Sequence, residues 1–148
     1  DDPSYFARKY IKIISLDENY LFNVDQRVIN NSDRSFDLFP FGLSKRQGIP
    51  EMQNFFILHE GPISITDGVL EEYDYDDLKE NKKIKHTSIG GWIGITDKYW
   101  QTAIIPNQNE PIHQTYSYSF AENVDNFQTD IVGEKIAVST IFPTMALI

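Results

Sequence analysis

A series of short apolar runs with a period of two, separated by turn residues, most constrains the fold of this chain. In residues 19–30, one parity carries apolar residues and the other carries three polar ones: Tyr20, Phe22, Val24 and Val28 against Asn23, Asp25 and Arg27. Because alternate side chains point to opposite faces of a strand, this pattern predicts a half-buried β-strand. Similar runs recur after Lys82. The sequence therefore predicts an all-β fold with little helix, either an antiparallel sandwich or a barrel.

Turn signals predict where the first strands end. Residues 31–35, with the sequence NSDRS, predict a turn, because Asn, Asp and Ser bond their own backbone and compete with strand pairing. Pro40 interrupts the apolar segment 36–43 and predicts an edge strand or a bulge at that point. Asp67 and Gly68 lie between two strand-like runs and predict a tight hairpin, because a type I′ turn needs positive φ at both positions.

Three further segments give local expectations. Residues 44–51 predict a loop, and the apolar residues 54–59 predict a short buried strand. Residues 74–81 predict one or two turns of helix, with an aspartate capping the start and Lys79 nearer the end. Because the chain shows no repeat, low-complexity tract or linker, it predicts a single domain over residues 1–148.

Both tryptophans and three of the eight glycines lie within residues 87–106. Glycine in a strand lets another backbone or a large ring approach closely, so we interpret this stretch as a packing device. The alternative is a platform for ligand stacking. Trp92, Tyr99 and Trp100 are the candidate aromatic residues for either role.

Charge and composition exclude several functions. The net charge is −9, so we expect no binding of nucleic acid, whose phosphates attract basic surfaces. The chain has no cysteine, which excludes thiolate catalysis, disulfides and cysteine-ligated zinc. Motifs for acyl transfer, phosphoryl transfer and dinucleotide binding are absent from the sequence. We therefore predict no catalytic residue, no cofactor and no enzymatic activity.

Histidine and acidic residues give no metal motif. His59 and Glu60 begin like a metalloprotease motif, but the second histidine is replaced by isoleucine, and Pro62 forbids the helix that the motif needs. His86 and His113 lie on separate predicted strands, where a histidine is usually hydrogen-bonded or exposed. We therefore predict no metal ligand.

Charged residues are abundant between positions 71 and 85. The six acidic residues lack the glycine and the spaced glutamate of a calcium-binding loop, so we interpret them as a solvated face. Lysines follow and are predicted to protect an edge strand from pairing with neighbours. They are Lys79, Lys82, Lys83 and Lys85.

Four longer phrases give a more specific indication. They are ISLDENYLFNVDQRVINNS, LFPFGL, ILHEGPISITDGVLEEYDYDDLKE and GGWIGITDKYWQTAIIP. In this order they resemble the later part of the large periplasmic domain of the YidC/Oxa1/Alb3 family of membrane protein insertases, in its alphaproteobacterial form. The resemblance covers residues 11–139. GGWIGITDKYW, followed by an apolar strand and a proline, is the most specific phrase.

The resemblance implies a fold and a role. The chain would be part of an antiparallel β-supersandwich, similar to the sandwich of galactose mutarotases. Its parent would be a multi-pass protein of the bacterial inner membrane, with this domain on the periplasmic side. The domain would support membrane protein insertion without catalysis, through contacts with the SecDF accessory proteins of the Sec translocon and with segments of client proteins.

The resemblance also leaves differences and an alternative. The family domain is longer on its N-terminal side, so an exposed edge strand is expected to pair with a second copy. Residues 140–148 depart from the family pattern. The alternative, by fold analogy, is a carbohydrate-binding or mutarotase-like sandwich. Its candidate acid and base residues are Glu60, His59, His86 and His113.

Overall fold

The computed structural model describes residues 8–49, 59–109, 113–138 and 144–147, the last four by their backbone alone. The chain divides into two compact units, each described here by itself. Unit 1 comprises Asp1–Pro40 and Glu134–Ile148, and unit 2 comprises Phe41–Gly133. The single domain over residues 1–148 stays a prediction.

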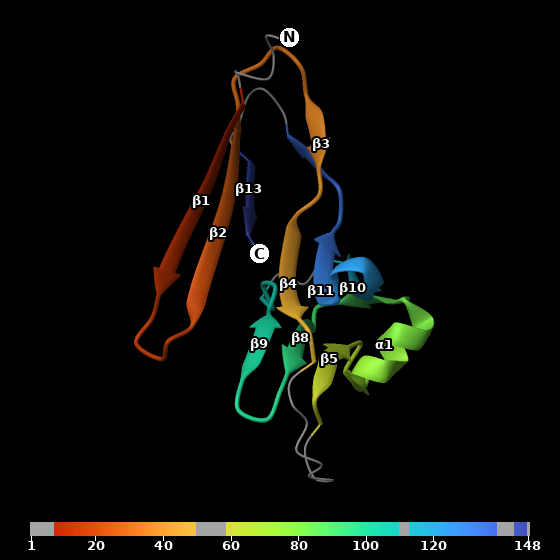
Figure 1. Ribbon diagram of the computed structural model, residues 1–148. Coiled ribbons are helices and arrows are strands. Elements are labelled where there is room, and N and C mark those ends of the chain that lie inside the picture. The colour runs from red at the N-terminus through yellow and green to blue at the C-terminus, as the bar shows by residue number, and fades with distance from the viewer. Residues whose placement is uncertain (1–7, 50–58, 110–112, 139–143, 148) are drawn as a thin grey trace. The chain divides into compact units, whose positions relative to one another are not determined.

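Unit 1 contains two small antiparallel sheets (Figure 1). The first has the strand order β1-β2-β13, and the second pairs β12 with β3. The strands are β1 (Arg8–Leu16), β2 (Phe22–Asn30), β3 (Phe36–Leu38), β12 (Ile136–Val138) and β13 (Thr144–Leu147).

Asp17 organises the turn between β1 and β2. Its carboxylate accepts hydrogen bonds from the backbone N–H groups of Asn19 (2.9 Å) and Leu21 (2.8 Å). Tyr20 has a φ of 64° and is exposed in this turn. Its predicted place in a half-buried strand is therefore wrong, because the aspartate side chain takes over the backbone groups that a ladder would need. The strand itself is confirmed from Phe22 onward.

The predicted interruptions after β2 are confirmed. Asn30 closes the turn at residues 31–35: its side chain accepts a hydrogen bond from the Ser32 backbone N–H (3.0 Å) and donates one to the Val138 carbonyl (3.3 Å). Pro40 then separates β3 from the next strand, and the two lie in different sheets.

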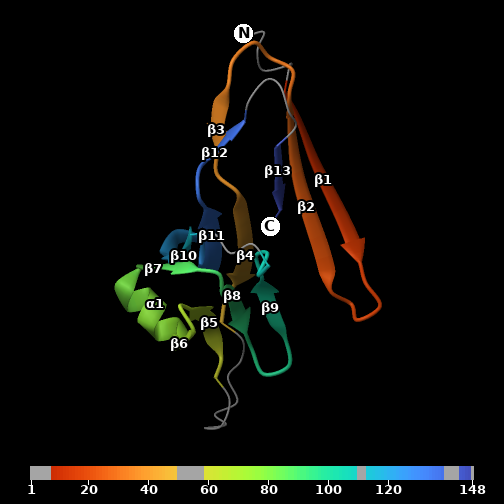
Figure 2. The same ribbon diagram turned by 180° about the vertical axis from the view of Figure 1, so that it is seen from behind.

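Unit 2 contains two four-stranded antiparallel sheets with the orders β4-β11-β10-β7 and β6-β5-β8-β9 (Figures 1 and 2). The first sheet consists of β4 (Phe41–Gln47), β11 (Asn126–Gly133), β10 (His113–Ala121) and β7 (Lys83–Ile89). The second consists of β6 (Val69–Glu72), β5 (Gly61–Thr66), β8 (Trp92–Thr96) and β9 (Gln101–Ile104). A short 3-10 helix, η2 (Glu122–Val124), joins β10 to β11.

The predicted hairpin and helix are both present. Asp67 and Gly68 join β5 to β6 with φ values of 50° and 78°. Helix α1 (Tyr75–Asn81) follows a capping box, in which the Asp77 carboxylate accepts a hydrogen bond from the Asp74 backbone N–H (2.9 Å). Among the described residues, no helix has the length and apolar character that crossing a membrane requires.

Residues 44–47 belong to β4, so the loop predicted over 44–51 is wrong in its first half. Register pairs Lys45 with Gln128 and Gln47 with Asn126 of β11. Pairing with the eight-residue strand β11 thus makes residues 44–47 a strand, although their polar sequence alone predicted a loop. Residues 54–58 of the predicted buried strand lie outside the described residues, and His59 precedes β5.

The core of unit 2 joins both sheets and α1. Tyr116 and Tyr118 are fully buried on one face of β10, as their shared parity predicts. The Phe127 ring lies 4.6 Å from that of Tyr75 and 4.7 Å from that of Phe120, measured between centroids. The same cluster of buried hydrophobic residues also contains Leu78, Ile93, Ile95 and Ile131. The predicted all-β antiparallel sandwich is therefore confirmed.

Replacing Ile93 with alanine tests this core. Ile93 is 0% exposed, so Ile93→Ala should lower the free energy of unfolding by about 2–5 kcal/mol through lost burial and a cavity. Ile105, which is 51% exposed, provides the matched control, and Ile105→Ala should change stability by less than about 0.5 kcal/mol. Urea denaturation followed by circular dichroism measures both. Equal losses would contradict the assigned core.

Candidate functional site

Two glycines bring the neighbouring strands close to β8. A Cβ atom at Gly94 would lie 2.2 Å from the Thr102 carbonyl oxygen in β9, and one at Gly91 would lie 2.1 Å from the Ile65 carbonyl oxygen. Real side chains do not tolerate such distances. At these two positions, the interpretation that glycine admits another backbone is confirmed.

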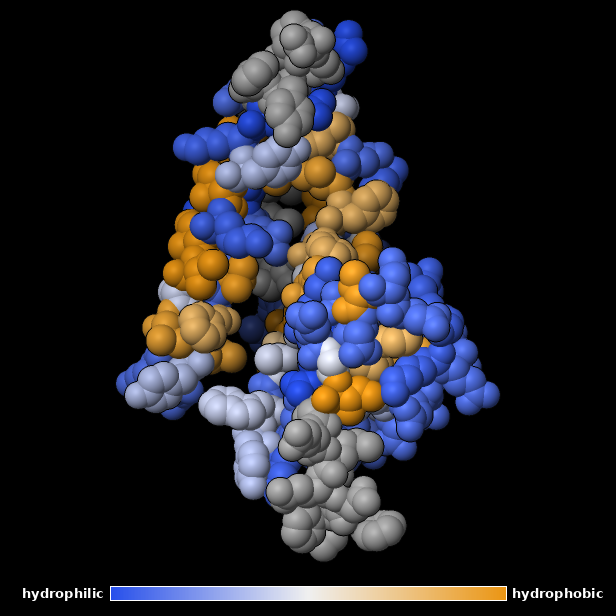
Figure 3. All heavy atoms as spheres, viewed as in Figure 1, coloured by the Kyte–Doolittle hydropathy of each residue, from blue (hydrophilic) through white to orange (hydrophobic). Residues whose placement is uncertain are grey.

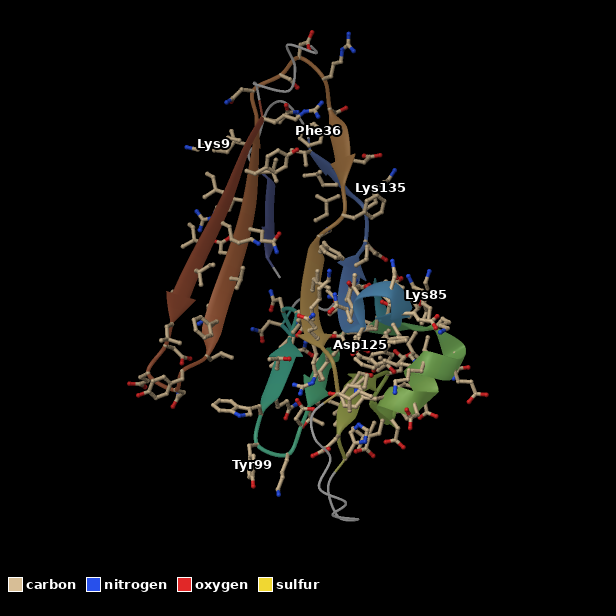
Figure 4. All side chains as sticks on the ribbon, viewed as in Figure 1. Lys9, Phe36, Lys85, Tyr99, Asp125 and Lys135 are labelled. Carbon is tan, nitrogen blue, oxygen red and sulfur yellow. The ribbon has the colours of Figure 1, made fainter. Side chains whose placement is uncertain are left out.

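The β8–β9 turn places two aromatic side chains in solvent. Asp97 and Trp100 close it through reciprocal backbone hydrogen bonds, of 2.8 Å from the Asp97 N–H and 3.3 Å from the Trp100 N–H. Tyr99 is 78% and Trp100 81% exposed, and Figure 4 shows Tyr99 at the tip, pointing away from the strands. Trp92, at the start of β8, is half-buried. The interpretation that Trp100 packs in the core is wrong. Trp100 closes a tight turn at the end of the sheet, and its side chain therefore lies outside the space between the two sheets.

A cleft of about 320 Å³ lies beside this turn. This volume is at the small end of the range of about 300–1,000 Å³ that is typical of small-molecule sites. Most of its side chains are polar or charged, and they come from β4, β8, β9 and the turn. They are Lys45, Arg46, Gln47, Ile95, Asp97, Trp100 and Thr102.

A fixed carboxylate lies in the cleft wall. Asp97 forms an ion pair with Arg46 and accepts a hydrogen bond from the Tyr75 hydroxyl (2.7 Å). Burial and the neighbouring Asp97 carboxylate raise the pKa of Tyr75, so this hydroxyl remains a donor. Arg46 Nε is buried with no hydrogen-bond partner among the described residues. The cleft therefore combines a preorganised donor and acceptor pair with an exposed indole.

A second polar contact joins the two sheets at the cleft. The hydroxyl oxygens of Ser44 in β4 and Thr102 in β9 lie 3.0 Å apart. Gly42 lets Ile104 pack on the same side, because a Cβ atom there would lie 3.1 Å from the Ile104 Cγ2. The edge strands β4 and β9 thus approach each other beside the cleft, which Thr102 also lines.

None of the three histidines lines this cleft. His59 Nε2 lies 3.1 Å from the Pro62 carbonyl oxygen, and His86 Nε2 lies 2.8 Å from the Tyr73 hydroxyl. His113 is exposed at the start of β10. The expectation that His86 and His113 are hydrogen-bonded or exposed is confirmed. Within the described ranges, no group of three or more acidic or histidine side chains is placed to hold a metal ion.

Two of the four lysines that were predicted to protect an edge strand lie on β7. β7 is an edge strand of its sheet, and Lys83 and Lys85 are exposed on it. The expectation is confirmed for these two lysines only, because Lys79 lies in α1 and Lys82 caps that helix. Sequence reasoning missed the cleft, because Lys45, Arg46 and Gln47 carry no motif and were expected in a loop. Only their pairing with β11 brings them beside the β8–β9 turn.

Comparison with known proteins gives a consistent result. The family model described as YidC periplasmic domain matches residues 6–140. The chain is 38% identical over 125 residues to the membrane protein insertase YidC of Rickettsia rickettsii (strain Sheila Smith), covering 84% of this chain and 22% of that protein. It is 39% identical to the protein of the same name from Rickettsia canadensis (strain McKiel), with the same coverage of 84% and 22%.

A third relative extends the match. The membrane protein insertase YidC of Rickettsia akari (strain Hartford) is 38% identical over 141 residues, which cover 89% of this chain and 25% of that protein. The chain therefore spans about a quarter or less of the length of these relatives.

Replacing Tyr75 with phenylalanine tests the support of Asp97. The variant loses a hydrogen bond to a charged group, so it should be less stable by about 1.5–3 kcal/mol at neutral pH. The raised pKa of Tyr75 makes a second prediction. Native Tyr75 keeps its proton when unfolded tyrosine loses it near about pH 10, so its contribution is present below that pH and is lost as the pH rises further.

Stability of the original chain should therefore fall more steeply above about pH 10 than that of Tyr75→Phe, with a difference of up to about 1.4 kcal/mol per pH unit. Urea denaturation at neutral and alkaline pH measures this difference. Tyr99→Phe is the control, since Tyr99 lies in solvent and the change should have no effect. Parallel pH profiles for the original chain and Tyr75→Phe would reject the assignment.

Proposed function

The chain belongs to the family of YidC periplasmic domains, and from this membership we propose that it acts as a non-catalytic interaction domain that supports membrane protein insertion. Its localisation is the periplasmic side of the bacterial inner membrane, as the resemblance implies. The observation that carries the proposal is the family match over residues 6–140. Client segments and the SecDF proteins of the Sec translocon are the proposed partners.

The geometry supports recognition better than reaction. The best-fixed polar group, the Asp97 carboxylate, is already engaged by Arg46 and Tyr75. The described histidines are engaged by Pro62 and Tyr73 or lie alone. A general acid and base would have to converge on one reacting group. What is available to a partner is instead an exposed aromatic turn beside a polar cleft.

A second copy of the chain is a further proposed partner. Strand β9 lies at the edge of its sheet, and its four residues, Gln101–Ile104, include no charged side chain. Charges on edge strands discourage pairing between molecules. Pairing through β9 would therefore meet less resistance than pairing through β7, which carries exposed lysines.

Binding measurements test the interaction role. We expect the purified chain to bind detergent-solubilised SecDF, or unfolded periplasmic segments of membrane proteins, with dissociation constants of about tens of micromolar or lower. Trp100→Ala should weaken binding by about fivefold or more, because exposed aromatic side chains often anchor interfaces. Tyr99→Phe, which keeps the neighbouring ring, is the control.

Light scattering on the chain alone should precede these titrations, so that self-association is measured separately. Absence of binding to both kinds of partner in this concentration range would remove the support for an interaction role. The domain would then be a spacer.

Carbohydrate binding is the second candidate, favoured by one observation. Trp100 is exposed beside a cleft lined by Arg46 and Asp97, which keep further donor and acceptor capacity beyond their mutual ion pair. A hydroxyl group both donates and accepts hydrogen bonds, so neighbouring sugar hydroxyls match such a pair. The indole face suits the apolar face of a sugar ring.

Titration with glucose and galactose, followed by tryptophan fluorescence, tests this second candidate. Saturable quenching that Trp100→Ala abolishes and Tyr99→Phe retains would support a sugar site. Trp92 remains as an internal reporter in the Trp100 variant. A linear response, or the same saturation in both variants, would reject the candidate.

A further inference from the structure

The β1–β2 hairpin of unit 1 exposes one strongly apolar face. Antiparallel register pairs Ile14 with Val24 and Leu16 with Phe22, so these four side chains point to the same side of the ribbon. Ile14 is 60% and Phe22 67% exposed. Figure 3 shows hydrophobic side chains gathered along β1 and β2. Contiguous exposed apolar surface of this kind usually marks an interaction site.

The same face continues into a groove within unit 1. Tyr10 and Val28 are also paired in register and lie on the same face, on the far side of the Lys12–Gln26 pair. They line a cavity of about 140 Å³ together with Phe39, Ile136 and Val138. Apolar pairs therefore lie on either side of the Lys12–Gln26 pair along β1, whose nine residues span about 30 Å.

Within the described residues, the backbone of β1 is paired along one side alone. In the described part of the chain, β1 has β2 as its only strand neighbour. β1 is nine residues long and contains no proline. A long edge strand with unpaired N–H and C=O groups is a template for another extended chain.

Charge restricts which chain can pair there. β1 contains Arg8, Lys9 and Lys12 and no acidic residue, although the whole chain carries a net charge of −9. None of the three forms an ion pair with a described carboxylate, and the nearby Asp25 is paired with Arg27. Arg8 and Lys9 lie in the first half of β1 and Lys12 lies at its centre, whereas Ile13, Ile14 and Leu16 lie in the second half.

A second copy of β1 is a poor occupant of this edge. Antiparallel pairing centred on the strand would place Lys12 opposite Lys12, and like charges directly opposite each other destabilise a sheet. Acidic side chains opposite the cations would instead form favourable cross-strand pairs. Charge complementarity therefore selects a different, acidic partner.

We propose that β1 binds an extended polypeptide segment by antiparallel strand addition, and that this segment has apolar residues in its N-terminal half and acidic residues in its C-terminal half. The order follows from the register, because an antiparallel partner begins opposite Leu16 and ends opposite Arg8. Its apolar side chains extend the face formed by Ile14, Leu16 and Phe22. This inference rests on the proposed interaction function and names the chemistry of the client segment.

Three nine-residue peptides and the purified chain test the proposal. The first has four apolar residues followed by acidic residues alternating with threonine; the second has the reverse order; and the third has lysine in place of each acidic residue. Titrations followed by amide chemical shifts should show the first peptide bound most tightly, with the shifts centred on residues 8–16. Tighter binding of the reversed peptide would overturn antiparallel addition. Equal binding of the lysine peptide would overturn the charge argument.

Charge reversal locates the site. Lys12→Glu should weaken binding of the first peptide by about fivefold or more and strengthen that of the lysine peptide. Lys83→Glu on the β7 edge changes the net charge equally and should alter the affinity by less than about twofold, since long-range effects are screened by salt. Both lysines are exposed, and thermal melting confirms that the variants fold. Equal effects of the two variants would overturn the assignment to β1.

Two outcomes separate this inference from the proposed function. If natural client segments bind and Lys12→Glu leaves their affinity unchanged, the β1 assignment is wrong and the interaction role stands. If no client segment or SecDF binds while the first peptide still binds at β1, the binding surface stands and the proposed role falls. A concentration-dependent dimer with shifts confined to residues 8–16 would overturn the choice of an acidic partner.

Discussion

The burial of aromatic rings between the two sheets of unit 2 is the interaction on which the rest of that unit depends. Tyr116 and Tyr118 from β10 and Phe127 from β11 are inaccessible to solvent and pack with Ile93 of β8. Tyrosine brings a hydroxyl into the core, and the Tyr116 hydroxyl is satisfied by donating to the Gly90 carbonyl. Burial raises the pKa of Tyr116 to about 12, so the side chain stays neutral at ordinary pH.

The packing of this core requires glycines at the start of the neighbouring stretch, residues 87–106. The Gly90 carbonyl must reach Tyr116, and Gly91 approaches the Ile65 carbonyl too closely for any side chain. Because β8 is held so tightly between its neighbours, the geometry of the following turn is fixed as well. Trp100 is therefore presented to solvent by a rigid support, which is how a binding residue is best positioned. The same packing that excludes water from Ile93 thus aims Trp100 away from the core.

Sequence predicted the elements whose cause is local and failed where the cause is distant. Asp67-Gly68 and the Asp74 cap fix their backbone through their own φ preferences and hydrogen bonds, so both were found. Residues 44–47 became strand through pairing with β11, some eighty positions away, and no local signal reports that. Trp100 was misjudged for a related reason: period-two alternation gives the face of a strand, but it does not show where the strand ends. The Arg46–Asp97 pair was missed because Arg46 was expected in a loop, although the tight connection that carries Asp97 was predicted between its two strands.

Basic residues occur on several of the described edge strands, and on β7 and β1 their surroundings give them different meanings. On β7, Lys83 and Lys85 alternate with the partly buried Ile84 and His86, and their charges protect the edge, although Ile89 at the end of the same face is exposed. On β1 the cations are accompanied by Ile13, Ile14 and Leu16, all exposed. Protection alone would not require these apolar side chains, and leaving them in water forgoes about 25 cal/mol for each Å² of apolar surface that could be buried. The β1 edge is therefore better explained as selective for its partner strand. Its cations repel basic strands and a second copy of β1, whereas a strand with acidic and apolar residues is able to pair.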